Sequence, residues 1–265
     1  MNNNITKNVK INNNNIIYKI FDPTKNITIL VDSDIDVKDQ PAIAKALMEI
    51  HPNAEQVGFV SFDENKNVKL RMAGGEFCGN ATMCAGVYAV MNDENDSMSF
   101  TKTIYVDALK KYVEVDIKCI DENKFIGTVN MPRAKEIKSI KFPDGKTYDV
   151  VYLQGISHII IDITNINFKN YFENKIKSYC DFLKVESLGI IFYDKNKNSI
   201  TPLVYVKNAD TLYWENSCAS GSIAVYEYLK IKNAELSILQ PCNEYLKIFE
   251  KNNKLYLSGE VMVLK

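Results

Sequence analysis

Hydrophobic and polar positions alternate over short stretches of this chain, and a few helical runs separate those stretches. Residues 112–119 carry an apolar side chain at every second position, which is the period of a strand with one buried face. Residues 41–51 instead have helical apolar spacing behind Asp39, a candidate N-cap. Shorter apolar runs predict further strands at residues 26–31, 58–62 and 68–72.

The second half of the chain repeats this layout after Asn130-Met131-Pro132. The likeness is sharpest at residues 77–82 and 217–222, each of which places a cysteine before small residues and a helical run. Such a repeat indicates an ancient internal duplication. Apolar runs of this half predict strands at residues 150–153, 158–163, 188–193 and 203–206, followed by a helix from Ser220.

The first fifteen residues contain two asparagine clusters and little apolar periodicity. We expect residues 1–15 to form a flexible tail, part of which could pair as an edge strand, and order to begin near Ile16. The same segment lacks the continuous apolar stretch of a signal peptide or a membrane span. A cytoplasmic protein is therefore expected.

Composition narrows the range of functions. The chain has 265 residues, of which 46% are hydrophobic, so it can bury a core. Its 32 basic and 33 acidic residues give a formal net charge of −1, which favours neither nucleic acid nor a membrane as partner. The six cysteines include no C-x-x-C pair, and His51 and His158 are the only histidines. Reduced thiols and no metal site are expected.

Cys78 and Cys218 stand where strand-like residues give way to a helix, so each thiol should lie at a helix N-terminus beside unpaired backbone N–H groups. That position favours a thiolate. The same N–H groups can hold a substrate carboxylate, and small residues such as Gly79 and Ala219 allow close backbone approach. One motif can thus supply a base and an anion site.

Two cysteines that face each other across a substrate would suit a racemase. A thiolate removes the α-proton of an amino acid on one face while a thiol donates a proton on the other, and the helix dipoles stabilise the developing charge. This scheme needs neither pyridoxal phosphate nor a metal, so no cofactor is expected.

An isolated cysteine among small residues is usually a compact buried side chain, which is the alternative interpretation. Two matching contexts, one in each half, weigh against that alternative for Cys78 and Cys218. The other four cysteines have no such partner and are expected to be structural: Cys84, Cys119, Cys180 and Cys242.

At these residues the sequence resembles the diaminopimelate epimerase family, whose half-sites read Cys-Gly-Asn-Gly and Cys-Gly-Thr/Ser-Gly. Here they stand as Cys78-Gly79-Asn80-Ala81 and Cys218-Ala219-Ser220-Gly221. The segment Lys25-Asn26-Ile27-Thr28 is similar to the family's Gly-Asn-Asp-Phe, and Gly155-Ile156-Ser157-His158 to its Gly-Asn-Pro-His. The resemblance implies that Asn26, Gly79, Asn80, Ala219 and Ser220 bind substrate. It implies that His158 borders the pocket, although a structural histidine is the alternative.

Within this superfamily the closer likeness is to histidine racemases that feed opine-type metallophore synthesis. It implies an α+β fold of two pseudo-symmetric domains, each a β-barrel-like sheet around a central helix, with the active site in a cleft whose closure excludes water. It also implies an N-terminal domain of residues 16–130 and 255–265 and a C-terminal domain of residues 131–254. The likeness covers most of the chain after Ile16 and is carried by residues 23–30, 55–59, 76–83 and 214–218.

The departures from diaminopimelate epimerases concern the distal end of the substrate. Where that family has Glu-Arg-Gly before the second cysteine, this chain has Ala209-Asp210-Thr211. Two asparagines that help the arginine are replaced by Ile156 and Gly189. Only Arg71 and Arg133 remain for bidentate carboxylate binding, and Arg71 is expected at the surface. A distal amino-carboxylate therefore lacks an obvious receptor.

Glu55 and Glu215 stand in segments shared with the histidine racemases and could accept hydrogen bonds from an imidazole or an ammonium group. For each, a solvated surface carboxylate is the alternative. Trp214 is expected to pack in the core. These observations favour a racemase that interconverts L- and D-histidine.

Other readings stay open. Within enzymes they are diaminopimelate epimerase itself or another amino-acid racemase of this fold, and outside enzymes a non-catalytic small-molecule binding protein with structural cysteines. Thiol accessibility distinguishes the classes, because catalytic cysteines should be accessible and low in pKa. The oligomeric state is not settled by the sequence, and a homodimer is one option.

Overall fold

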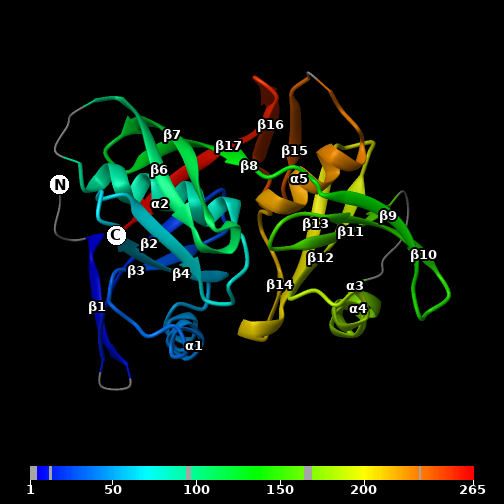
Figure 1. Cartoon of the computed structure of the whole chain (residues 1–265), viewed down its shortest axis with the longest axis horizontal. Coiled ribbons are helices and arrows are strands. Elements are labelled where there is room, and N and C mark those ends of the chain that lie inside the picture. Colours follow the sequence, from blue (N-terminus) through cyan, green and yellow to red (C-terminus); the bar gives the residue numbers. More distant parts are fainter. Residues whose placement is uncertain (1–4, 12–13, 94–96, 164–168, 233) are drawn as a thin grey trace. The chain divides into compact units, whose positions relative to one another are not determined.

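The computed structural model describes residues 5–11, 14–93, 97–163, 169–232 and 234–265. The fold is mixed α+β and dominated by strands, with few helices, as the sequence predicts (Figure 1). The chain divides into two compact units, unit 1 with residues 1–130 and 258–265 and unit 2 with residues 131–257. Within the described residues, no helix has the length and apolar character needed to cross a membrane.

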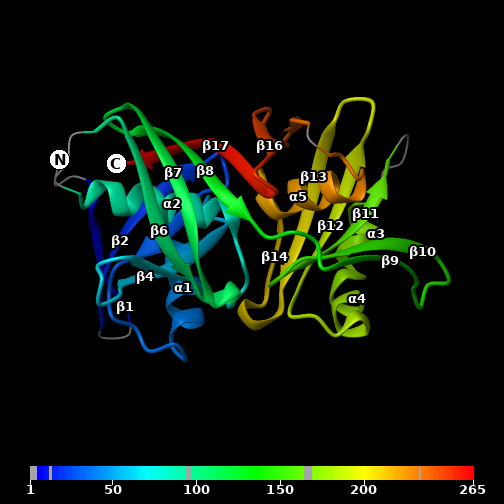
Figure 2. The same ribbon diagram turned by 45° about the horizontal axis from the view of Figure 1, so that its top comes forward.

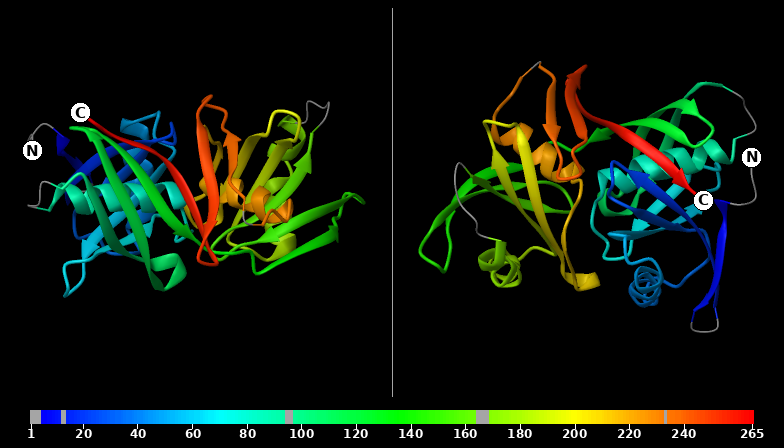
Figure 3. Two further views of the ribbon diagram at one scale, coloured as in Figure 1. Left: turned by 90° about the horizontal axis from the view of Figure 1, so that it is seen from above. Right: turned by 180° about the vertical axis from the view of Figure 1, so that it is seen from behind.

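Unit 1 pairs its strands in a fixed succession. β2–β3 is antiparallel, β3–β4 parallel, β4–β5 antiparallel, β5–β6 parallel and β6–β7 antiparallel. The C-terminal strand pairs with β2 and β8, and Figure 3 shows this red strand beside the blue β2. The strands are β1 (Lys7–Ile11), β2 (Asn14–Pro23), β3 (Thr28–Val31), β4 (Gln56–Phe62), β5 (Val68–Met72), β6 (Ser99–Val106), β7 (Lys111–Asp121), β8 (Lys124–Met131) and β17 (Lys254–Leu264).

Helix α2 (Gly79–Met91) is the centre of unit 1. It is buried on nearly every side and contacts β2, β3, β5, β6 and β7, as expected for a helix without a polar face. At Gly86 an added Cβ would lie 2.7 Å from Cγ1 of Val115, so the absence of a side chain lets β7 approach the helix. The amphipathic helix α1 (Gln40–Ile50) packs on β4 through Ile43, Ala44 and Leu47.

The flexible tail expected over residues 1–15 does not describe residues 7–11, where the structure shows the strand pairing that the sequence left open. Residues 7–11 form β1, which pairs with β2 over five residue pairs from Lys7–Tyr18 to Ile11–Asn14. The side chains of Val9 and Ile11 pack against the core that α1 covers. The backbone hydrogen bonds and this apolar contact offset the loss of chain entropy that the asparagine-rich composition led us to expect. Residues 1–4 and 12–13 lie outside the described residues.

Unit 2 repeats the succession of unit 1. β10–β11 is antiparallel, β11–β12 parallel, β12–β13 antiparallel, β13–β15 parallel and β15–β16 antiparallel. Figure 2 shows helix α5 (Ala219–Tyr228) among these strands. This helix contacts β10, β11, β12, β13 and β16. The strands are β9 (Glu136–Lys141), β10 (Thr147–Tyr152), β11 (Ser157–Asp162), β12 (Ser187–Asp194), β13 (Ser199–Val206), β14 (Thr211–Trp214), β15 (Leu236–Leu239) and β16 (Tyr245–Lys251).

The helices of unit 2 take the same places between strands as those of unit 1. A second core forms where α4 packs on β12, and Trp214 contacts this core as expected. The α-helices are α3 (Lys169–Glu173), α4 (Ile176–Leu183) and α5 (Ala219–Tyr228). The described part of the chain also has the 3₁₀ turns η2 (Asp107–Leu109) and η3 (Lys207–Ala209).

Candidate active site

Cys78 and Cys218 are the N-cap residues of α2 and α5. Their backbones are nearly the same, with φ −129° and ψ 114° at Cys78 and φ −128° and ψ 104° at Cys218. The N–H of Ala81 donates to Sγ of Cys78 at 3.4 Å, and the N–H of Gly221 donates to Sγ of Cys218 at 3.3 Å. Each sulfur therefore takes the place that a Ser or Asp oxygen usually has at a helix start.

The residue four positions after each cysteine secures the cap. Oγ1 of Thr82 donates to the carbonyl of Cys78 at 2.7 Å, and Oγ of Ser222 donates to the carbonyl of Cys218 at 2.8 Å. The first backbone N–H groups of each helix lie beside the sulfur and give the N-terminus its partial positive charge. Each N-terminus can therefore stabilise a thiolate or bind a carboxylate.

An amide network surrounds the start of α2. Asn26 is 1% exposed, and its Oδ1 accepts from Nε2 of Gln56 at 2.5 Å and from Nδ2 of Asn80 at 3.0 Å. Its own Nδ2 donates to Oε2 of Glu55 at 2.5 Å. Gln56 also donates to Oγ1 of Thr28 at 2.8 Å. The amide of Asn26 therefore holds Glu55 and the second residue of α2 in fixed positions.

The start of α5 is held by Gln240. Its Oε1 accepts from the backbone N–H of Cys218 at 3.0 Å, and its Nε2 donates to Oγ of Ser222 at 3.0 Å and to the carbonyl of Ile238 at 3.1 Å. The side chain is 2% exposed, so it replaces water as the partner of the helix start. No residue of the Gln240-Pro241-Cys242-Asn243 segment had a role assigned from the sequence.

His158 lies beneath the first turn of α5. Its Nε2 and Oγ of Ser220 are 3.0 Å apart, and burial lowers the pKa of His158 to about 3, so the ring is neutral. The ring occupies the space over Gly189, where an added Cβ would lie 2.2 Å from Nδ1. Ser220 is in turn 3.7 Å from Sγ of Cys218. His158 is 0% exposed, and Ser220 links it to the cysteine.

The surroundings of the two thiols differ. Cys218 is 3% exposed, whereas Cys78 is half-buried. Burial raises the pKa of the Cys218 thiol well above its usual value, and the carboxylate of Glu215, which accepts a hydrogen bond from the thiol, raises that pKa further. The N–H of Gly221 opposes this rise. In the structure as it stands, Cys218 is therefore held as a thiol.

Every residue proposed from the sequence lies near one of the two helix starts. Asn26, Glu55 and Asn80 meet at α2, and His158, Glu215 and Ser220 meet at α5. Gly79 and Ala219 are the first residues of their helices.

Sequence reasoning missed Gln56, Gln240 and Gly189 as members of these networks. Gln56 interrupts the start of an apolar strand and is next to Glu55, which was a usable signal. Gly189 was noted only as the replacement of a family asparagine, and no role was assigned to Gln240.

The remaining cysteines fit the structural interpretation. Cys84 and Cys180 are buried, Cys119 and Cys242 half-buried, and no disulfide joins any of the six. Among the described residues, no group of three or more His, Cys, Asp or Glu side chains is placed to hold a metal ion. Both arginines form ion pairs inside their own units, Arg71 with Asp107 and Arg133 with Glu227 and Glu250. Arg71, expected at the surface, is half-buried.

Comparison with known proteins gives consistent matches over nearly the whole chain. The family described as histidine racemase CntK N-terminal domain matches residues 15–261. A histidine racemase of Fusobacterium nucleatum subsp. nucleatum is 35% identical over 252 residues, covering 92% of this chain and 93% of the relative. A histidine racemase of Staphylococcus aureus is 26% identical over 254 residues, covering 91% of this chain and 90% of the relative.

Two solved structures show the same fold at low sequence identity. A hydroxyproline epimerase from Agrobacterium vitis, with trans-4-hydroxy-L-proline bound, has a TM-score of 0.68 and 10% identity over 94% of this chain and 91% of that one. A protein described as a predicted epimerase from Pseudomonas aeruginosa has a TM-score of 0.68 and 14% identity over 94% and 96% of the two chains.

Proposed function

The chain belongs to the histidine racemase family and is an isomerase, and from this premise we propose that it interconverts L- and D-histidine with Cys78 and Cys218 as its two acid–base groups. The observation that carries the proposal is the matched pair of cysteine N-caps, because each supplies a sulfur and a set of N–H donors in one place. The family and the relatives matched confirm the resemblance found in the sequence. The role of the cysteines rests on the geometry of the two helix starts.

In the proposed reaction the two helix starts face the substrate from opposite sides. The thiolate of one cysteine takes the proton from Cα of histidine, and the electron pair of that C–H bond delocalises into the carboxylate. The N–H groups at the helix starts stabilise the added charge. The thiol of the other cysteine then donates its proton to the opposite face of Cα. The products are the other enantiomer and an enzyme with thiol and thiolate exchanged, ready for the reverse reaction.

The difference between the thiols sets the resting state. Burial and the Glu215 carboxylate keep Cys218 protonated, and in our proposal the half-buried Cys78 takes the part of the base at the start of the cycle. The substrate that requires this state is the enantiomer whose α-hydrogen faces Cys78. The opposite enantiomer requires that Cys218 lose its proton first. The macroscopic pKa values of the rate belong to the pair and not to either cysteine.

Glu55 and Glu215 supply acceptors for the substrate's nitrogen atoms. Glu55 is oriented by the amide of Asn26, and Glu215 lies beside Cys218. An imidazole N–H or the α-ammonium group can donate to either carboxylate. A distal carboxylate, as in diaminopimelate, would be buried beside acidic groups, and Arg133 is already paired with Glu227 and Glu250. An unpaired buried carboxylate costs on the order of several kcal/mol, which disfavours that substrate.

The proposal extends to features that the comparisons support only in coarser form. The repeated succession of strand pairings supports two pseudo-symmetric domains, each a β-barrel-like sheet around its central helix. Six cysteines without a disulfide support a reducing compartment, the cytoplasm. A homodimer remains a prediction that light scattering can test.

The decisive experiment follows histidine in deuterium oxide. Purified protein is incubated with L-histidine, and chiral chromatography with mass spectrometry measures the appearance of D-histidine and of deuterium at Cα. We expect both, and little epimerisation of diaminopimelate in a parallel reaction. Rapid epimerisation of diaminopimelate with inert histidine would refute the substrate. Binding of histidine without any exchange at Cα would favour the non-catalytic alternative.

A further inference from the structure

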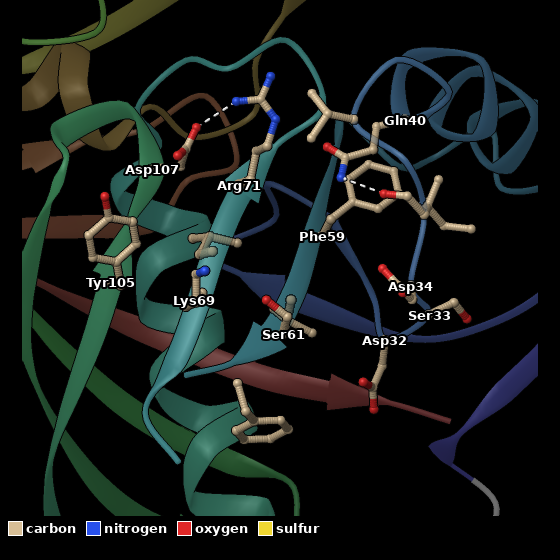
Figure 4. A pocket seen from close by; sticks show the side chains of 15 residues that line it. Asp32, Ser33, Asp34, Gln40, Phe59, Ser61, Lys69, Arg71, Tyr105 and Asp107 are labelled. Atoms are coloured by element: carbon tan, nitrogen blue, oxygen red, sulfur yellow. Dashed lines mark hydrogen bonds and ion pairs between the residues drawn. The ribbon is translucent and has the colours of Figure 1, made fainter. Parts of the chain in front are cut away.

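Unit 1 contains a cavity of about 480 Å³ that shares no residue with the network around Cys78. Its walls come from β4, β5, the start of η2 and the segment of residues 32–40 before and at the start of α1. Figure 4 shows it from close by. The volume lies in the range of small-molecule sites, and charged and polar side chains line the cavity together with apolar ones.

Arg71 presents one edge of its guanidinium to this cavity. Nη1 donates to Oδ2 of Asp107 at 2.5 Å, which fixes the plane of the group. Nε is buried, and within the described residues it has no hydrogen-bond partner. Nε and Nη2 form the second edge of the guanidinium fork, which matches the two oxygens of a carboxylate. Figure 4 shows Arg71 with its Asp107 partner on one side and this edge on the other.

Gln40 provides the second unsatisfied group. It is 6% exposed, and its Nε2 donates to the carbonyl of Ile35 at 3.2 Å. This bond fixes the orientation of the amide, because a flipped amide would place two acceptors together. Oε1 is buried and has no hydrogen-bond partner among the described residues, and Figure 4 shows it turned toward the side of Arg71. An acceptor in this position requires a donor from a bound molecule.

The other walls add charge of both signs and apolar surface. Lys69 lies two residues before Arg71 on the same face of β5, and its Nζ is 5.9 Å from the ring centre of Tyr105. Asp34 lies on the opposite side in Figure 4. Phe59, the strand partner of Arg71, contributes apolar surface. The cavity thus holds cations at one end, acceptors at the other and apolar surface.

We propose that this cavity is a second, non-catalytic site for an amino acid with an apolar side chain. Its carboxylate would bind the Nε–Nη2 edge of Arg71, supported by Lys69, and its ammonium group would donate to Oε1 of Gln40 and to Asp34. Its side chain would lie on Phe59, which pairs with Arg71 across β4 and β5. Both unsatisfied atoms gain partners in this arrangement. The inference does not depend on which amino acid the enzyme racemises.

Isothermal titration calorimetry of the full-length protein with L-leucine tests the site. Two fragments separate the roles of the charged groups: 4-methylpentanoate lacks the ammonium group and 3-methylbutylamine lacks the carboxylate. We expect saturable binding of L-leucine and at least tenfold weaker binding of each fragment. Arg71→Lys removes the fork and Gln40→Met removes the acceptor, and each should weaken L-leucine binding about tenfold, the worth of one good hydrogen bond. Lys118→Met, on the exposed face of β7, is the matched control and should bind as wild type.

Thermal melting establishes that each variant is folded, and Gln40→Met keeps the test valid if Arg71→Lys does not fold. The proposal is overturned if L-leucine gives no saturable heat, which would leave water as the occupant of the cavity. It is also overturned if both variants bind L-leucine as the wild-type protein does. Racemisation of histidine is measured in parallel and should be unchanged in Gln40→Met and Arg71→Lys. Loss of L-leucine binding together with loss of racemisation would assign the cavity to the substrate site and overturn a separate one.

Discussion

Cys78 and Cys218 begin their helices with the same backbone geometry, and the groups that surround them differ. At Cys78 the second helix residue, Asn80, bonds to an asparagine that Gln56 holds in place. At Cys218 the second helix residue, Ser220, bonds to a buried neutral His158. The caps supply the same N–H groups to both sulfurs, so the caps cannot make the thiols unequal. Burial and Glu215 make them unequal by raising the pKa of Cys218.

The parallel strand pairs show how each unit makes room for its own polar group. In β3–β4, Thr28 lies beside Gln56, a small side chain next to a long one. In β11–β12, His158 lies beside Gly189, a large side chain next to none. The long or large side chain is on the second strand of the pair in unit 1 and on the first strand of the pair in unit 2. A duplicated scaffold can therefore keep its backbone while the residues beneath each cysteine diverge.

The largest expected effect comes from removing either sulfur. Cys78→Ala and Cys218→Ala should each lower the rate of histidine racemisation at least about 1,000-fold, since each removes one of two essential acid–base groups. Cys→Ser variants should lose most of the rate, because serine is a far weaker base. Chiral chromatography measures the rate. Cys119→Ala, which changes a half-buried cysteine of β7, is the control. A cysteine variant that keeps near-wild-type activity would end the symmetric two-base scheme.

The next effect tests the inequality of the thiols. Iodoacetamide near neutral pH should label Cys78 before Cys218, and peptide mass spectrometry can follow both sites. Because the Glu215 carboxylate raises the pKa of Cys218, Glu215→Gln should lower that pKa and increase the labelling of Cys218 severalfold.

Glu235→Gln serves as a control for this measurement, since Glu235 pairs with Lys247 at the surface. Equal labelling of both cysteines in the wild-type protein would show that the two half-sites do not differ in the way proposed.

Two glycine-to-alanine substitutions, one in each unit, compare how tightly the two units are packed through their free energies of unfolding. In Gly189→Ala the new Cβ would lie 2.2 Å from the ring of His158, which cannot move without losing Ser220. In Gly58→Ala, on the matching strand of unit 1, the nearest atom is Cδ1 of Leu70, the end of a flexible side chain. We expect Gly189→Ala to lower the free energy of unfolding by about 1–3 kcal/mol more than Gly58→Ala does. Urea denaturation measures both, and equal losses would contradict a tightly held His158.

The smallest effect is a pH dependence of stability that His158 contributes in unit 2. Burial lowers the pKa of His158 to about 3 in the folded protein, below the unfolded value of about 6.5. The unfolded chain therefore takes up the proton first, so the stability that the neutral ring allows is complete above pH 6.5 and falls as the pH decreases toward 3. The slope is about 1.4 kcal/mol per pH unit.

Urea denaturation of the wild-type protein and of His158→Asn between pH 7 and pH 5 should reveal this slope as a difference between the two proteins. His51→Asn should keep most of the wild-type slope, because His51 is half-buried. Parallel curves for wild type and His158→Asn would mean that His158 is protonated or exposed in solution.

The sequence predicts the local features well where the pattern is strong. The strand expected at residues 68–72 coincides with β5, and the helix expected at residues 41–51 is displaced by one residue as α1. Asp39 is its N-cap but makes no side-chain cap bond. Short strands such as β14 and β15 were missed, because four residues give too little alternation to detect. The sequence left β1 as an alternative only, because the asparagine-rich composition outweighed Val9 and Ile11 in our expectation.

For the site, the sequence by itself determined which residues begin the two helices. A cysteine before small residues, with Thr82 or Ser222 four positions later, is local information, and the caps form from it without distant contacts. Only the tertiary structure decided what each sulfur meets. Gln240 reaches Cys218 from 22 residues away along the chain, and His158 reaches Ser220 from 62 residues away. Burial and long-range hydrogen bonds set the pKa of a thiol, and neither can be read from the residues next to it.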